Sequence, residues 1–357
     1  MKLPIRPVVA GSPDYPFVAI DAPIKLDQNE SSTDLPPALK ARVLERMATV
    51  AWNRYPEMHA QTLAQAIGEH DGWPASGVVV TPGSNAMIPA LIQLAALRSQ
   101  VLTVMPGFAL YGLDARLLGV DLTEIALQAD WSLDVEALLA ALANAPAPAS
   151  PGEPAGVLFL PQPHAPTGSL EALATLETIA AAATGWLVVI DEAYYQFAGS
   201  DARELARRHP HVVLLRTFSK AWGLAGVRVG YALAGDEMAA QLRKLVVPFG
   251  LSVLQSVAAL VALEQPELMR ERVAQVISER ARIASALADH PRWQVIPSHG
   301  NFLLIRTPDA AQAIQGLLQH GVLVRRQDSL YGLEGCIRMT VGTPDQNDAF
   351  IAAALQL

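Results

Sequence analysis

Short apolar runs recur through the middle of the chain and are separated by segments of helical length. They are VLTVM (101–105), GVLFL (156–160), WLVVID (186–191), VVLLRT (212–217) and VRVGYALA (227–234). Because these runs are apolar on both faces, they are typical of parallel strands that helices cover on both sides. The sequence therefore predicts an α/β fold with a mostly parallel central sheet.

The two ends of the chain follow a different pattern. A helical segment at 266–289 precedes three strand candidates, WQVIPS, NFLLIR and CIRMTVG, with a second helical pattern at about 308–320. This order indicates a smaller α+β domain. The first thirty residues, rich in proline, look like an extended arm that docks on another part of the protein or on another subunit. We expect an N-terminal arm and part of the small domain in 1–45, a large cofactor-binding domain in 46–245 and a small C-terminal domain in 246–357.

Composition narrows the class of protein. About half of the 357 residues are apolar, which is enough for a large core, and the single cysteine, Cys336, excludes a disulfide framework. The net charge of −8 argues against a general nucleic-acid binder. We find neither a signal peptide nor a stretch that resembles a membrane span, and therefore expect a soluble cytoplasmic protein. The Ala/Pro tract at 143–156 is interpreted as a surface connection.

Polar residues follow two of the predicted strands at their carboxyl ends. Asp191 ends WLVVID, and Lys220 comes directly after VVLLRT, beside the hydroxyls of Thr217 and Ser219. Open α/β sheets bind ligands at this edge, and a partly desolvated lysine is a nucleophile toward carbonyl groups. Taken alone, Asp191 could equally cap the next element, and Lys220 could be an ordinary loop lysine.

Two segments could bind an anion. Arg228, which we expect to open the next strand, could join Thr217 and Ser219 in a phosphate cup. Ser84 and Asn85, in TPGSNAMIPAL, lead into a predicted helix whose free N–H groups attract phosphate, although both are also ordinary helix caps.

Together the segments suit one cofactor. It would have a phosphate for the cup, an aldehyde for Lys220 and a ring nitrogen for Asp191. Pyridoxal 5′-phosphate has all three groups. The joint pattern is far more specific than any of its parts.

A series of motifs in fixed order strengthens this interpretation. They are LDQNES (26–31), NRYPE (53–57), GSNAM (83–87), PGFALY (106–111), HAPTG (164–168), DEAY (191–194), RTFSKAWGLAGVRVGY (216–231), NFLLIR (301–306) and GCIRMTVGT (335–343). By these motifs the chain resembles the fold-type I pyridoxal-phosphate aminotransferases of class I/II, and among them the histidinol-phosphate branch. The resemblance implies transamination of histidinol phosphate with 2-oxoglutarate or glutamate in histidine biosynthesis, by a ping-pong mechanism through pyridoxamine phosphate.

The resemblance also implies roles for residues around the cofactor ring. Lys220 would form the Schiff base and move a proton between the substrate and the cofactor. Asp191 would pair with the ring nitrogen, Tyr194 would donate to the phenolic oxygen O3′, and Phe108 would stack on the ring. A core position is the alternative for Tyr194 and for Phe108.

The phosphate and the substrate have their own implied residues. Thr217, Ser219, Arg228 and the backbone of Ser84 and Asn85 would hold the phosphate. Tyr55 would reach the neighbouring subunit's phosphate site, which implies a homodimer with shared active sites. Arg338 and Arg325 would bind the acidic end of the substrate, with Tyr15 completing that site, whereas Arg326 would be solvated. A bidentate arginine suits both carboxylates and phosphate esters.

One motif departs from the family pattern. HAPTG has Ala165 where the family has an asparagine that donates to O3′. Alanine cannot donate, so we expect the cofactor nitrogen joined to Lys220 to have a raised pKa, unless His164, Gln162 or a water fills the role of the asparagine. A histidine in a turn is more often an exposed or capping residue than a direct participant.

Other functions remain open at this point. The same scaffold also supports aromatic amino-acid transamination and decarboxylation of threonine phosphate, and pocket shape separates such substrates by only a few kcal/mol. A non-catalytic binder, such as the ligand-sensing half of a transcription regulator, is disfavoured because the chain leaves no room for a DNA-binding domain. An enzyme is the preferred interpretation.

Overall fold

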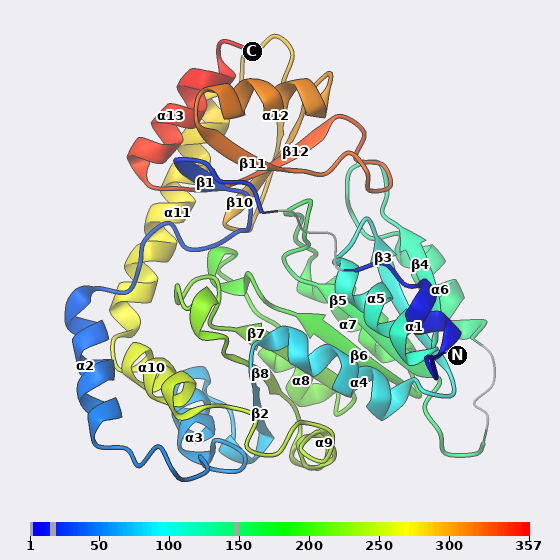
Figure 1. Ribbon diagram of the computed structural model, residues 1–357. Helices are drawn as coiled ribbons and strands as arrows, with labels where there is room; N and C mark the ends of the chain where they lie inside the picture. Colours follow the sequence, from blue (N-terminus) through cyan, green and yellow to red (C-terminus); the bar gives the residue numbers. More distant parts are fainter. Residues whose placement is uncertain (1–2, 15–18, 146–149) are drawn as a thin grey trace.

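A seven-stranded sheet forms the middle layer of the larger part of the molecule (Figure 1). The computed structural model describes residues 3–14, 19–145 and 150–357. The strand order is β2-β8-β7-β6-β5-β3-β4, and every neighbouring pair is parallel except those that involve β8. The predicted α/β fold with a mostly parallel sheet is confirmed. The strands are β2 (Val78–Thr81), β3 (Gln100–Met105), β4 (Asp121–Ala126), β5 (Gly156–Pro161), β6 (Trp186–Asp191), β7 (Val212–Thr217) and β8 (Gly230–Leu233).

Helices cover both faces of this sheet. On one face lie α4 (Met87–Ala95), α5 (Ala109–Leu118) and α9 (Asp236–Leu242). The other face carries α3 (Gln61–Asp71), α6 (Val135–Ala143), α7 (Leu173–Ala182) and α8 (Arg203–Arg208). Every residue of β5, β6 and β7 is buried, and alternate residues of β6 enter the two opposite cores. This alternation explains why those strands read as continuous apolar runs.

A second, five-stranded sheet lies above the first in Figure 1, in the order β1-β11-β12-β10-β9. The strands β9, β10 and β12 and the helices α11 and α12 confirm the predicted elements, whereas β1 and β11 were not predicted. The parallel pair of β1 and β11 ties the N-terminal segment to this sheet. The elements are β1 (Ile24–Leu26), β9 (Gln294–Ile296), β10 (Phe302–Arg306), β11 (Val322–Arg326), β12 (Cys336–Thr340), α11 (Pro266–Ala286), α12 (Ala310–Gln319) and α13 (Pro344–Ala354).

The N-terminal arm is not extended throughout. Residues Pro7–Gly11 form a short helix, α1, which lies beside α5, and the Arg6 guanidinium donates to the Leu117 carbonyl. Farther along, α2 (Pro37–Ala48) packs against α10 (Val253–Leu263). The described part of the arm therefore docks on its own chain.

One strand boundary was predicted wrongly. Arg228 does not open a strand: it follows the 3-10 turn η4 (Ala225–Val227) with a left-handed φ of 61°, and β8 begins at Gly230. Within the described ranges, no helix has the length and apolar character needed to cross a bilayer.

Candidate active site

The candidate site lies where β6 and β7 end. Because side chains alternate along a strand, Asp191 and Thr217 share one face of the sheet with the core beneath α4 and α5. Their neighbours Glu192 and Arg216 point to the other face, where the Arg216 Nε donates to the Glu192 carboxylate at 2.7 Å. The ends of two adjacent parallel strands thus present one acid and one hydroxyl to the same side.

Asp191 is a buried carboxylate with defined hydrogen-bond donors. It is 8% exposed, its Oδ2 accepts from the Tyr111 hydroxyl at 2.7 Å, and its Oδ1 accepts from the Ala193 amide at 3.0 Å. Burial raises the pKa of Asp191, while these two hydrogen bonds and the charge of Lys220 oppose the rise. The strand end therefore holds an oriented carboxylate that suits a cationic ring nitrogen.

Phe108 and Tyr111 form an aromatic wall beside Asp191. The Tyr111 ring stacks on Phe159 with centroids 4.6 Å apart, and Phe108 meets Tyr111 edge to face at 5.6 Å. Phe108 stands directly before α5 and is only half-buried, so part of its ring is open to a ligand. Tyr111 was not predicted as a site residue; its i+3 spacing from Phe108 at the start of a helix was the available signal.

Lys220 lies in the loop after β7. Its Nζ donates to the Gln28 carbonyl at 3.1 Å and lies 5.7 Å from the centre of the Tyr194 ring. The lysine is half-buried. The fold therefore brings together the predicted lysine, the predicted tyrosine and a segment next to β1 that is about 190 residues away in sequence.

The predicted phosphate cup is a connected set of donors. The Thr217 hydroxyl donates to the Ser219 hydroxyl at 2.9 Å and accepts from the Ser219 amide at 3.0 Å. The Arg228 Nη1 donates to the same Ser219 hydroxyl at 3.3 Å. Two hydroxyls and a guanidinium thus lie within hydrogen-bonding reach of one another, as a phosphate requires.

Two glycines let a helix start approach this cup. A Cβ on Gly83 would lie 2.3 Å from the Arg228 Nη2, and a Cβ on Gly230 would lie 2.1 Å from the Ser84 amide nitrogen. Ser84 and Asn85 form the turn η2 (Ser84–Ala86), which runs directly into α4. The first N–H groups of that helix therefore adjoin Arg228, and the donor set fits a phosphate dianion.

Tyr194 connects the two sheets. Its hydroxyl accepts from the Asn29 side-chain amide at 3.0 Å, and its ring packs edge to face on Phe302 of β10 at 5.1 Å. The Arg338 guanidinium lies over the Phe302 ring, 5.5 Å from its centre. Asn29 was not predicted as a site residue, although it belongs to the motif LDQNES.

Arg325 and Arg338 stand directly opposite each other on the antiparallel strands β11 and β12. Residues in such a pair point to the same face of the sheet, and both arginines are half-buried. The Arg338 Nη2 donates to the Asp27 carbonyl at 3.1 Å. Arg326 is exposed and pairs with Asp328, in agreement with a surface position. Tyr15 lies outside the described residues.

The turn HAPTG folds tightly on itself. His164 is only 3% exposed, and its Nδ1 lies 2.7 Å from the Thr167 hydroxyl. Burial lowers the pKa of His164 to about 4, so the ring is neutral at physiological pH. Of the two expected positions, exposed or capping, the exposed one is wrong, because the ring packs inside its own turn. The Gln162 side-chain oxygen accepts from the Glu171 amide at 3.0 Å.

Tyr55 lies apart from these groups on the surface of this subunit. It is 83% exposed, and its ring packs against Phe249 at 5.0 Å.

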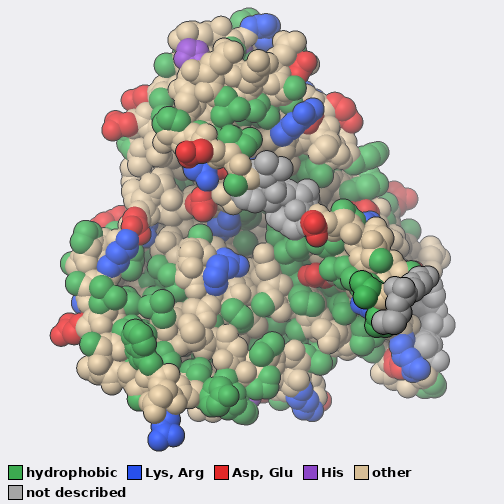
Figure 2. Space-filling model, viewed as in Figure 1, with side chains coloured by type: hydrophobic (Ala, Val, Ile, Leu, Met, Phe, Trp, Pro, Cys, Tyr) green, Lys and Arg blue, Asp and Glu red, His purple; other side chains and the backbone are tan. Residues whose placement is uncertain are grey.

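Figure 2 shows basic and acidic side chains in the hollowed middle of one face, between the part of the molecule built on the small sheet and the part built on the large sheet.

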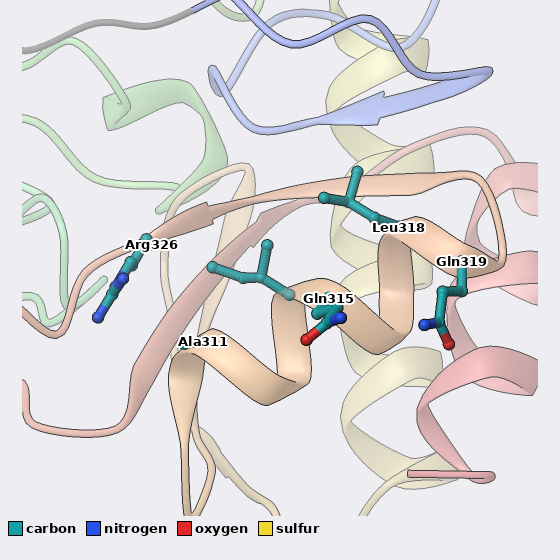
Figure 3. A pocket seen from close by; sticks show the side chains of 6 residues that line it. Ala311, Gln315, Leu318, Gln319 and Arg326 are labelled. Carbon is teal, nitrogen blue, oxygen red and sulfur yellow. The ribbon is translucent and has the colours of Figure 1, made fainter.

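A separate depression lies on the outer side of α12 (Figure 3). It is lined by Ala311, Ile314, Gln315, Leu318, Gln319 and Arg326. None of the residues predicted for the site belongs to this lining, which consists of apolar and amide side chains with one arginine. The depression is therefore a surface feature of the small domain and not the candidate site.

Comparisons with known proteins agree with this geometry. Residues 21–354 match the family "Aminotransferase class I and II". The chain is 51% identical to the histidinol-phosphate aminotransferase of Deinococcus radiodurans, over 99% of this chain and 96% of that protein. It is 36% identical to the histidinol-phosphate aminotransferase of Thermococcus kodakarensis, over 98% of this chain and 97% of that protein. The crystal structure of histidinol-phosphate aminotransferase from Sinorhizobium meliloti in complex with pyridoxal-5′-phosphate superposes with a TM-score of 0.87 at 24% identity, covering 100% of this chain and 98% of that one. This chain belongs to the class I and II aminotransferase family.

Proposed function

We propose that the protein is a pyridoxal-phosphate-dependent histidinol-phosphate aminotransferase, which passes the amino group to 2-oxoglutarate in histidine biosynthesis. The observation that carries the proposal is that the chain has both a set of residues suited to the cofactor and a pair of arginines suited to an anionic substrate. A buried acid and a set of phosphate donors lie at the end of the large sheet, and two opposed arginines lie on the face of the small sheet. The names of the two relatives support the substrate.

The residues present fit pyridoxal phosphate. Arg228, Ser219, Thr217 and the start of η2 would hold its phosphate, and Asp191 would face its ring nitrogen. When bound, this cofactor supplies an electron-withdrawing ring that accepts negative charge from the substrate carbon. The buried Asp191 carboxylate would keep the ring nitrogen protonated and so strengthen that effect.

The remaining groups hold the ring and move a proton. Lys220 would hold the cofactor at its aldehyde carbon, and its amine, once free, would carry a proton to and from the substrate carbon. The Tyr194 hydroxyl would donate to the cofactor's phenolic oxygen, and Phe108 would lie against its ring. Each of these side chains is held by a neighbouring element, as a preorganised site requires.

The arginine pair explains how one pocket accepts two substrates. Arg338 and Arg325 present planar N–H donors from one face of the small sheet. Such donors bind the phosphate ester of histidinol phosphate and the side-chain carboxylate of glutamate in alternate half-reactions. The Phe302 ring, which contacts both Arg338 and Tyr194, sets the separation between the anion site and the cofactor site.

A steady-state comparison of amino donors tests the substrate. We expect histidinol phosphate to exceed phenylalanine, tyrosine and threonine phosphate in kcat/KM. Of these four donors, it alone carries both a phosphate ester and the imidazole ring that is found in histidine. A tenfold or greater advantage for phenylalanine would contradict the proposal. Carbon dioxide release from threonine phosphate would assign the chain to decarboxylation.

We further propose that the enzyme is a cytoplasmic homodimer with shared active sites. Exposed apolar side chains gather around the Tyr55–Phe249 contact, and the Phe249 amide donates to the Met58 carbonyl. Six residues after Phe249, the Gln255 side chain donates to the Arg228 carbonyl at 2.6 Å, which places the start of α10 beside the phosphate cup. The other exposed members of this surface are Trp52 and Val247. The single cysteine suits a reducing compartment.

Subunit mixing tests the shared site. The variants Lys220→Ala and Tyr55→Ala carry their defects in different parts of a composite site. If Tyr55 serves the neighbouring subunit, unfolding and refolding the two inactive variants together restores one intact site in each mixed dimer. Absence of recovered activity, or sedimentation of the wild type as a monomer, would contradict this part of the proposal.

A further inference from the structure

Asn29 is a buried polar residue that the proposed chemistry does not yet use. It is 2% exposed and adopts a left-handed conformation with φ of 53°. Asparagine tolerates this region better than most residues, but a buried amide still needs hydrogen-bond partners on both its oxygen and its nitrogen. The contacts of Asn29 therefore define what it does.

The hydrogen bonds around Thr340 fix the orientation of the Asn29 amide. The Thr340 hydroxyl accepts from the Asn29 backbone N–H at 2.8 Å, so its own hydrogen is available to the Asn29 Oδ1, 3.4 Å away. The other end of the amide, Nδ2, then points to the Tyr194 hydroxyl at 3.0 Å. Nδ2 can only donate, and so the tyrosine oxygen is the acceptor.

This arrangement leaves the Tyr194 proton for another partner. A phenol has one hydrogen, and a phenol oxygen that already accepts a hydrogen bond becomes a stronger donor. The Lys220 amine lies 5.7 Å from the centre of the Tyr194 ring. The Tyr194 hydroxyl thus keeps its proton for a further acceptor, which in the proposed complex would be the cofactor's phenolic oxygen.

We infer that Asn29 is a positioning residue for the reaction: it donates to Tyr194 and thereby orients and strengthens the hydrogen bond from Tyr194 to the cofactor's phenolic oxygen. This inference rests on the proposed function. It explains how the site works with Ala165, whose methyl group cannot donate to that oxygen. An amide is present in the site, but it acts through the tyrosine.

The same residue ties this hydrogen bond to the substrate side of the molecule. Thr340 and Arg338 lie two residues apart on β12 and therefore on one face of the strand. The Asn301 side chain, just before β10, donates to the Asn29 carbonyl at 3.0 Å. Asn29 is thus held by the sheet that carries the arginine pair, while its side chain serves the cofactor site.

Two substitutions separate this role from a structural one. Asn29→Gly removes the amide and keeps the positive φ without strain. Asn29→Asp keeps the shape of the side chain but replaces the amide donor with a carboxylate. The carboxylate would accept a hydrogen bond from the Tyr194 hydroxyl, whose proton would then no longer be available to the cofactor. Ser31→Ala is the matched control, because the Ser31 hydroxyl donates to the Thr33 carbonyl at 3.0 Å and accepts from the Thr33 amide at 3.5 Å, both within its own turn. Thermal unfolding of each unloaded variant verifies folding.

The readout is a pH titration of the absorbance band of the bound cofactor. A donor to the phenolic oxygen stabilises the deprotonated chromophore, so weakening it raises the pKa of the nitrogen that Lys220 contributes. We expect a rise of about 0.5 to 1 unit for Asn29→Gly and at least as much for Asn29→Asp. Ser31→Ala should leave the band's pKa unchanged.

A double-variant cycle with Tyr194→Phe decides the question. Tyr194→Phe should itself raise the pKa of the band, and adding Asn29→Gly to it should then produce no further rise, since the amide acts through the tyrosine. An equal rise in the Tyr194→Phe background, or no rise in the wild-type background, overturns the role of Asn29 and leaves the proposed function standing. If Tyr194→Phe does not move the band, the assignment of Tyr194 fails, and the inference with it.

Discussion

The two halves of the candidate site are built in different ways. On the large sheet, the groups follow the ends of β6 and β7, and Thr217, Ser219 and Arg228 already bond to one another. On the small sheet, Arg325 near the end of β11 and Arg338 in the middle of β12 face each other across the register. The first half is a set of mutually satisfied donors, whereas the second places two like charges side by side.

This difference indicates which half depends on its ligand. Strand ends and short hydrogen bonds keep the large-sheet half in place by the fold itself. The arginine pair lies on the face where the anionic groups of the substrates are proposed to bind, and guanidinium groups suit both carboxylates and phosphate esters. We therefore expect substitutions in the large half to affect the chemistry or the fold, and substitutions in the small half to affect substrate affinity.

The largest effect is expected from Lys220→Ala. Removing the amine deletes both the covalent attachment of the cofactor and the group that moves the substrate proton, so turnover should fall by at least about 10⁴-fold. The phosphate donors remain, so the variant should retain part of its cofactor. Steady-state rates and the cofactor absorbance of the purified variant measure both effects, and a variant with substantial turnover would remove Lys220 from the mechanism.

The buried ion pair behind the large half should dominate its stability. Arg216 is fully buried, pairs with Glu192 and lies 3.9 Å from the Tyr195 ring centre. Arg216→Met leaves buried carboxylates without their cation and should lower the free energy of unfolding by roughly 3 to 5 kcal/mol. Urea denaturation checks this value. The exposed pair of Arg270 and Glu267 offers the control, since Arg270→Met should cost less than about 1 kcal/mol.

A matched pair of arginine substitutions sharpens the contrast between the halves. Arg338→Ala should lower kcat/KM for histidinol phosphate and for glutamate by roughly 10- to 100-fold, since it removes charge-assisted hydrogen bonds to both anions. Cofactor affinity should not change. Arg228→Ala should instead weaken cofactor binding. Kinetics at saturating cofactor, together with cofactor titrations, separate the two, and cofactor loss in Arg338→Ala would contradict the division.

The smallest effect concerns pH. Burial lowers the pKa of His164 to about 4, so the unfolded chain takes up the proton first as the pH falls. The stabilisation from the neutral ring is complete above the unfolded pKa of about 6.5 and is lost as the pH falls toward 4, by roughly 1 kcal/mol per pH unit at most. Unfolding free energies of wild type and His164→Gln across this range should converge at low pH. Parallel profiles would show that His164 does not titrate as its burial predicts.

The sequence predicted best what local pattern determines. The strands β5, β6 and β7 are buried on both faces and therefore read as apolar runs, and Asp191 and Lys220 could be identified by their places after two of them. The strand β4 was missed because it is an edge strand with no fully buried residue. Short strands such as β1 depend on a partner far along the chain.

The contacts that complete the site could not be predicted in the same way. Tyr111 and Asp191 are 80 residues apart, and Asn29 and Tyr194 are 165 apart. No local spacing encodes such pairs, because tertiary packing brings them together. The left-handed backbone conformation of Arg228 could not be predicted either, since non-glycine residues rarely adopt that conformation. The β-branched neighbours of Arg228 favoured a strand instead.

The most direct test of the two-half account is a pair of single-turnover experiments on the purified enzyme with its cofactor. Histidinol phosphate added without an oxo acid should convert the visible cofactor band in one turnover, and 2-oxoglutarate added afterwards should restore it. In Arg338→Ala, both conversions should require much higher substrate concentrations while the starting band stays unchanged. A wild-type band that responds to phenylalanine but not to histidinol phosphate would contradict the proposed use of the arginine face.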